Sequence, residues 1–102
     1  MARIMILYPN TPDARFDMDY YKNNHIALVR SSLGDAVERL SVHKGLGGPG
    51  GAPAAFLVSA AIEFRDMKSL AAAIAQHGAK ISQDVPNFTT IVPIMQIEET
   101  II

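Results

Sequence analysis

The order of its segments predicts that this chain of 102 residues folds as a single α+β domain of the ferredoxin-like type. Four runs have the composition of β-strands, and two stretches have the 3.6-residue apolar periodicity of helices. Segments rich in glycine or proline separate most of them. The resulting order, βαββαβ, specifies two helices on one face of a four-stranded antiparallel sheet. Since this length is typical of one domain, we expect residues 1–102 to share one fold.

The first half of the pattern covers residues 3 to 44. Arg3–Tyr8 is an apolar run closed by two prolines, which predicts the first strand. Asp17 can cap the helix that follows, whose apolar side chains recur at helical spacing. Gly34 is expected to end this helix, because glycine readily adopts the left-handed conformation. Val37–Lys44 is the second predicted strand.

The second half opens with a long predicted strand, Ala54–Phe64, whose side chains alternate between two faces. Asp66 is expected to cap the second helix, and Gly78 to end it. Ala79–Asp84 is interpreted as a further short turn of helix. Thr89–Glu98 is the last predicted strand, and its proline should place it at an edge of the sheet or at a bulge.

An excess of apolar residues predicts that two copies of the chain associate. Hydrophobic residues make up 49% of the sequence and charged residues only 19%. The two helices cover one face of the sheet, and an uncovered apolar face is an association site. We therefore expect a homodimer in which two sheets face each other, with Val58 among the side chains between them.

Composition argues against several classes of function. The formal charge is −1, and no basic patch suggests nucleic-acid binding. No apolar run approaches the roughly 18 residues of a membrane span. Cysteine is absent, so neither a disulfide nor a thiol nucleophile is expected, and this absence fits a cytoplasmic protein.

The segment Gly45–Pro53 contains a literal G-x-G-x-x-G string. In a dinucleotide-binding site this string precedes a helix whose N-terminus holds the pyrophosphate. Here a strand-like run follows, so a loop is the better interpretation. The three histidines lie on different elements without ligand spacing, so we expect neither a metal ion nor another cofactor.

His25 is the main candidate for a catalytic residue. It lies in the middle of the first predicted helix, on the stripe that faces the sheet. It is either a core histidine held by a backbone or tyrosine partner, or a general acid/base in a cleft. Tyr8, Tyr21 and Asn24 are candidate substrate-binding residues that the fold could bring close to it. His43 is a weaker candidate, since a histidine at the end of a strand, beside the glycine-rich loop, is more often an exposed residue than part of a pocket.

These residues also carry a resemblance to a known family. The strand that ends at Tyr8-Pro9, the segment 16–29 (FDMDYYKNNHIALV) and the later segment 84–88 (DVPNF) resemble the EthD family, named after ethyl tert-butyl ether degradation. The resemblance implies a dimeric α+β barrel, a superfamily that includes cofactor-free monooxygenases, polyketide cyclases, muconolactone isomerases and haem-degrading enzymes. It also implies that the helix histidine of the family corresponds to His25.

Two kinds of function therefore remain open. One is a cofactor-independent enzyme, such as a monooxygenase, decarboxylase or cyclase, that transfers protons or adds oxygen to a small hydrophobic or carbonyl compound. The other is a binding or accessory protein without catalysis, working beside a P450 system in ether degradation. A haem-dependent activity has only His25 as a possible iron ligand. Fold resemblance alone does not decide between them.

Overall fold

A computed structural model of the protein describes residues 1–102. The strands are β1 (Ala2–Pro9), β2 (Val37–Lys44), β3 (Phe56–Phe64) and β4 (Ile94–Glu99). They form one antiparallel sheet in the order β2-β3-β1-β4. The predicted α+β ferredoxin-like fold is confirmed.

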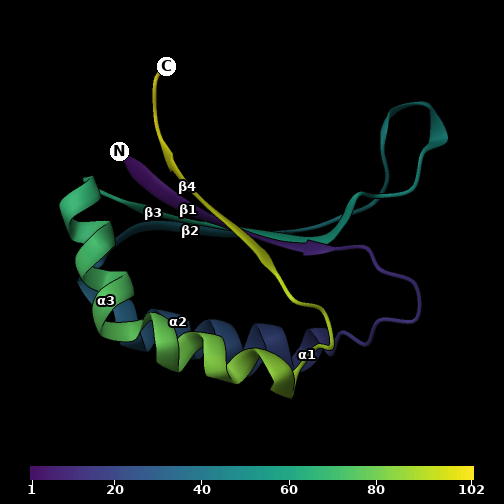
Figure 1. Cartoon of the computed structure of the whole chain (residues 1–102), viewed down its shortest axis with the longest axis horizontal. Coiled ribbons are helices and arrows are strands. Elements are labelled where there is room, and N and C mark those ends of the chain that lie inside the picture. The colour runs from purple at the N-terminus through teal and green to yellow at the C-terminus, as the bar shows by residue number, and fades with distance from the viewer.

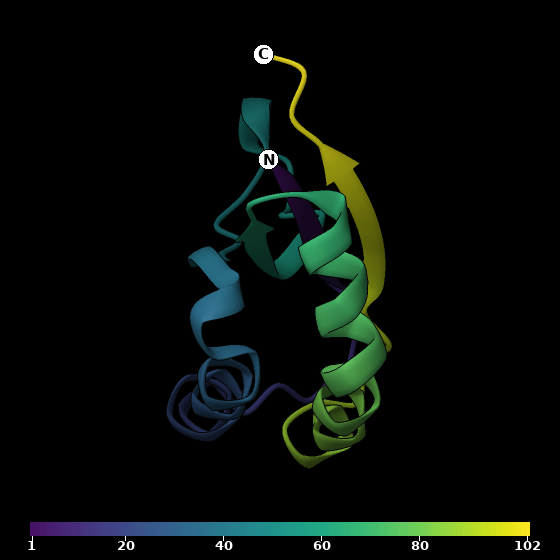
Figure 2. The same cartoon turned by 90° about the vertical axis from the view of Figure 1, so that its left-hand side faces the viewer.

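Two helical arms cover one face of this sheet. The first runs through α1 (Met18–Tyr20), the π-helical turn η1 (Tyr21–His25) and α2 (Ile26–Leu33), and the second is α3 (Met67–Asp84). Short 3₁₀ turns occur at η2 (Gly34–Ala36), η3 (Pro49–Gly51) and η4 (Val85–Asn87). Figures 1 and 2 show both arms on the same side of the sheet, with the other side bare. No helix is long and apolar enough to cross a membrane.

The helix starts agree with the sequence, but one predicted helix end is wrong. Asp17 and Asp66 each accept a hydrogen bond from the backbone N–H three residues ahead, and Gly34 ends α2 with a φ of 53°. Gly78, however, does not end the second helix, because α3 continues to Asp84. Its backbone stays helical because Ile81, in the next turn, packs against the core.

The last strand begins later than predicted. It starts at Ile94 rather than Thr89, and Pro93 lies directly before it. Thr89 instead forms an isolated bridge with Phe16, and its hydroxyl donates to the carbonyl of Arg15. The segment before the strand therefore fastens the end of α3 to the chain that enters α1. As predicted, β4 lies at an edge of the sheet.

The two sheet faces are now distinguishable. Val58 is 1% exposed and lies under the helices, so its predicted place between subunits is wrong. The register puts the other set of alternating residues on the face that no helix covers; we call this the open face. Its apolar members are Met5, Leu7, Ala61 and Ile94.

Four charges of alternating sign cross the open face in one row, one from each strand. Arg39 pairs in register with Glu63, which pairs with Arg3, which pairs with Glu98. The Arg3 Nε lies 2.6 Å from a Glu98 oxygen, and the Arg39 Nε lies 3.8 Å from a Glu63 oxygen. We call these four residues the charge row.

The loop between β2 and β3 stands apart from the helices. Figure 1 shows that it projects beyond the end of the sheet, on the side away from α2 and α3. Gly50 and Gly51 have φ angles of 71° and 80°, which side chains with a Cβ rarely adopt. No helix follows this loop, so the structure gives it no resemblance to a dinucleotide-binding turn.

Candidate functional site

The first helical arm contains one wide turn at the centre of the candidate site. The N–H of Ile26 donates to the carbonyl of Tyr21, five residues back, whereas an α-helix bonds four residues back. Such π-helical turns are rare and are often found at functional sites. This one begins at Tyr21 and ends at His25, the two candidate residues on the helix that become buried.

His25 is held by a carboxylate from the end of the other helical arm. The residue is 4% exposed, and its Nδ1 lies 2.9 Å from Oδ2 of Asp84. The second carboxylate oxygen, Oδ1, accepts hydrogen bonds from the Tyr20 hydroxyl at 2.8 Å and from Asn87 Nδ2 at 2.9 Å. Asp84 thus connects the first arm, α3 and η4 through hydrogen bonds.

These hydrogen bonds assign the proton on His25. Burial works against ionisation of Asp84, but the bonds from His25, Asn87 and Tyr20 outweigh burial and lower the pKa of this carboxyl. An ionised carboxylate only accepts hydrogen bonds, so Nδ1 carries the proton that it receives. In a neutral imidazole the other nitrogen, Nε2, then has a free lone pair. Nε2 is therefore the ring nitrogen that is free to accept a hydrogen bond or a proton.

The Nε2 atom is not sealed inside the protein. Ser32 Oγ is the one side-chain polar atom that is both fully enclosed and without a hydrogen-bond partner. His25 bonds within the chain only through Nδ1, and its Nε2 is not among the fully enclosed unpaired atoms, so this nitrogen keeps at least a small exposed area.

Aromatic rings enclose the imidazole. Tyr21 stacks on it with centroids 5.6 Å apart, and Phe88 contacts it at 4.6 Å. Phe88 is fully buried and also contacts Tyr8, Phe16 and both tyrosines of the first arm. The rings fix the plane of His25, while Asp84 fixes its rotation within that plane.

Two buried tyrosines next to His25 resist ionisation. Burial raises the pKa of Tyr21 to about 12. Burial, and secondarily the neighbouring Tyr21, raise the pKa of Tyr8 above its usual range.

These shifts predict a loss of stability in alkali. Between about pH 10 and 12 the unfolded chain releases the Tyr21 proton and the folded chain keeps it, so stability falls as the pH rises. Tyr21→Phe removes this contribution and should reduce the loss by roughly 1.4 kcal/mol per pH unit. Urea unfolding at pH 8, 10 and 11 measures the difference. If the free energy of unfolding fell equally with pH in the wild type and in Tyr21→Phe, Tyr21 would ionise as freely in the folded state as in the unfolded chain.

The structure brings together three of the five residues predicted for the site. Tyr8, Tyr21 and His25 share one aromatic cluster. Asn24 follows Tyr21 in the wide turn but is exposed. His43 is paired with Ser59 on the open face, on the other side of the sheet from His25. A role in substrate binding stays a prediction for all of them.

The sequence reasoning missed Asp84, the group that orients His25. Asp84 was assigned only to a short helical turn, and it lies 59 residues from His25 along the chain. One signal was available: Asp84, Asn87 and Phe88 belong to the segment 84–88, and all three contact the site. No cluster of three or more histidine, cysteine or acidic side chains is placed to hold a metal ion.

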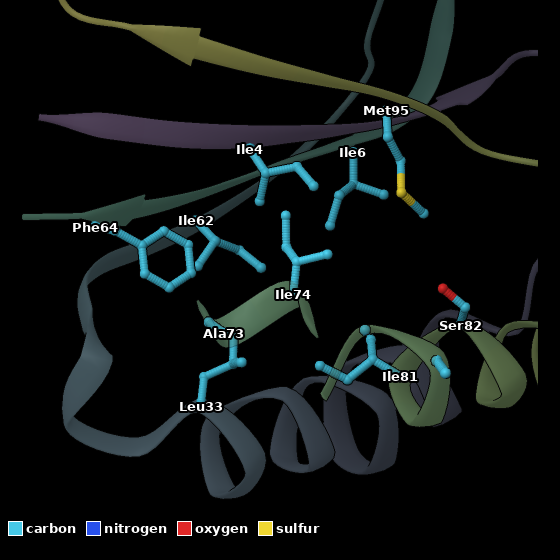
Figure 3. A pocket seen from close by; sticks show the side chains of 12 residues that line it. Ile4, Ile6, Leu33, Ile62, Phe64, Ala73, Ile74, Ile81, Ser82 and Met95 are labelled. Atoms are coloured by element: carbon cyan, nitrogen blue, oxygen red, sulfur yellow. The ribbon is translucent and has the colours of Figure 1, made fainter. Parts of the chain in front are cut away.

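A separate apolar cavity lies between α3 and the sheet. Figure 3 shows its lining, which includes Ile4 and Ile6 from β1, Ile74 from α3 and Phe64 from β3. Its volume is about 210 Å³, and ten of its twelve lining residues are hydrophobic. His25 does not line it. The cavity and the histidine are therefore two distinct features of the same face of the sheet.

Comparison with known proteins identifies the family. An EthD-like protein from Ralstonia eutropha JMP134 is 38% identical in sequence, with a TM-score of 0.89 over 99% of this chain and 92% of that one. This chain belongs to the EthD-like family. A second EthD-family structure, from Bacillus halodurans C-125, is 22% identical with a TM-score of 0.78, covering 99% of both chains. No family model matches the chain, and no match was found among curated proteins.

More distant structures extend the fold beyond the EthD-like family. A variant of the cofactor-independent oxygenase SnoaB from Streptomyces nogalater has a TM-score of 0.57 at 9% identity. The match covers 99% of this chain and 91% of that protein. At this identity the likeness shows the fold alone.

Proposed function

We propose that this EthD-like protein acts on a small, mostly apolar or carbonyl compound by proton transfer at His25 Nε2, without a metal or other cofactor. The observation that carries the proposal is the 2.9 Å contact between His25 Nδ1 and Asp84. It leaves Nε2 with a free lone pair, which can accept a proton from a compound bound beside it. Enclosure by aromatic rings keeps most water away from the ring.

The test is His25→Gln, which keeps a hydrogen-bonding side chain of similar size but cannot exchange protons near neutral pH. Turnover should fall about 100-fold or more, while stability changes by less than about 1.5 kcal/mol. The compound for the assay is one identified by native mass spectrometry of freshly purified protein. His77→Gln, on α3 and away from the site, is the matched control and should retain activity. An unchanged rate in a folded His25→Gln variant would remove His25 from catalysis.

A positioning role for Asp84 predicts a different pattern. Asp84→Asn keeps the shape of the side chain but no longer enforces a proton on Nδ1. The rate should fall by about 10-fold or more, and the pH profile of turnover should shift because the imidazole has lost its carboxylate. If Asp84 is only structural, Asp84→Asn should lower stability but leave the pH profile of turnover by the folded protein unchanged.

A second candidate function is supported by the position of the cavity. The apolar space beneath α3 could enclose an apolar metabolite, as a carrier requires. His25 does not line this space, so a compound held there would not contact the imidazole. In this case the protein is an accessory protein of a degradation pathway, such as ether oxidation by a P450 system. Tight binding of a co-purifying compound without its conversion would favour this function.

We also infer that a second copy of the chain covers the open face. A twofold axis parallel to the strands would put β2 opposite the partner's β4, and β3 opposite the partner's β1. Arg39 would then meet the partner's Glu98, and Glu63 the partner's Arg3. The charge row is thus complementary to itself in this arrangement, and the apolar residues beside it would be buried together.

A further inference from the structure

The apolar cavity beneath α3 continues into a second, more polar groove. This groove has a volume of about 570 Å³ and runs along the end of α3, η4 and the segment before β4. Ser82 and Met95 line both spaces, so the two meet at these side chains. Figure 3 shows the Ser82 hydroxyl pointing from α3 toward the sheet, near Met95. A molecule in the cavity could therefore extend past Ser82 into the groove.

The cavity end suits a compact hydrocarbon group. Its lining is aliphatic apart from Phe64, Gly78, Ser82 and Met95. A dry apolar cavity of about 150 Å³ is large enough for benzene, so about 210 Å³ accepts a chain or ring of slightly greater size. Ile74 and Met95 are 38% and 49% exposed, which leaves apolar surface for a ligand to cover.

The groove end suits an anion. Arg15 lines it, and Nη2 of its guanidinium donates to the carbonyl of Pro86, another lining residue, at 3.2 Å. None of the four ion pairs in the protein includes Arg15. A guanidinium has five N–H donors, so most of them are free to bind a carboxylate, which arginine can hold through two parallel bonds. Thr90 adds a hydroxyl group to the same wall, and this hydroxyl only accepts a bond within the protein, from the N–H of Arg15, so its proton is free to be donated.

We propose that the cavity and the groove form one binding site for a small amphipathic carboxylate, whose apolar body lies beneath α3 and whose carboxylate binds Arg15. This inference deepens the carrier function proposed above by naming its ligand class. It does not depend on catalysis by His25. Ser82, at the junction, is placed to accept or donate one hydrogen bond to the middle of the ligand.

The test compares octanoate with 1-octanol, which have the same chain length but differ in charge. Binding is followed by amide chemical-shift changes in ¹⁵N-labelled protein. Octanoate should bind at least 10-fold more tightly, with shifts in α3, β1 and the segment around Arg15. Arg15→Met should remove this advantage and leave octanol binding unchanged. Arg30→Met, which removes an equally unpaired arginine from α2, should affect neither compound.

A second variant tests the apolar end. Gly78 lines the cavity within α3, and a Cβ added there meets only Ile74 Cγ2, at 3.4 Å. Gly78→Leu should therefore fold normally, which a thermal melt checks. Its side chain should fill the cavity and weaken the binding of both compounds at least 10-fold. Equal binding of the two compounds would overturn the carboxylate assignment while leaving the carrier function intact. If neither octanoate nor 1-octanol binds, the carboxylate assignment and the carrier function are both wrong. Either result leaves the proposal for His25 to its own turnover test.

Discussion

Exchanging the charges of Arg3 and Glu98 should leave each subunit folded but prevent two copies from associating. The exchanged charges still attract each other across β1 and β4, where the wild-type pair lies 2.6 Å apart. The charge row, however, changes from alternating signs to two like charges at its centre. Facing the same row in a second copy, Arg39 would now meet a positive charge and Glu63 a negative one. Like charges juxtaposed across an interface cost several kcal/mol, so the dissociation constant should rise at least 100-fold.

Adding Arg39→Glu and Glu63→Arg reverses the whole row, which becomes self-complementary again. The fourfold variant should therefore recover the dimer, although every one of its row charges differs from the wild type. Sedimentation velocity at micromolar concentration measures association, and circular dichroism checks the fold of each variant. Wild-type association in the double variant, or a wild-type protein that is monomeric at this concentration, would contradict the proposed pairing of the open faces.

The fold was predictable because its signals are local. Alternation in β3, helical spacing in both arms and capping by Asp17 and Asp66 depend on residues only a few positions apart. The errors arose where a distant contact decides the outcome. Gly78 remains helical because α3 gains contacts with the sheet beyond it, and Thr89 leaves the strand to bond with the chain around Arg15. Alternation also shows that a strand has two faces but not which of them the helices cover, which explains the error at Val58.

The candidate site was predictable only in part. His25 stood out as a polar residue on an apolar helix stripe, and Tyr8 and Tyr21 lie on elements that the fold places beside it. Asp84 gave no comparable signal, because its partners come from both arms and meet only in three dimensions. The wide turn from Tyr21 to His25 could not be predicted from the sequence either, because it depends on whether the Ile26 N–H donates to the carbonyl four or five residues back.

Truncation of Phe88 should cause the largest loss of stability among single core substitutions at this site. Its ring is fully buried and lies at the centre of the aromatic cluster, 4.6 Å from His25 and 5.1 Å from Tyr21. Phe88→Ala would leave a cavity that rigid neighbouring rings cannot easily fill, at a cost of about 3–5 kcal/mol. For a small domain this approaches the whole free energy of unfolding, so a substantial fraction should be unfolded at 37 °C.

Urea unfolding at a fixed protein concentration measures this loss, because association would otherwise shift the midpoint. Val92→Ala, at a side chain 83% exposed on the segment before β4, is the matched control and should change stability by less than about 0.5 kcal/mol. Phe88→Leu fills more of the volume of the lost ring than alanine does, so its loss of stability should lie between those of Phe88→Ala and Val92→Ala. If Phe88→Ala lost no more than the control, the cluster would not be the packed support of His25 that its geometry indicates. A large loss would instead show that the ring which positions the imidazole also stabilises this end of the fold.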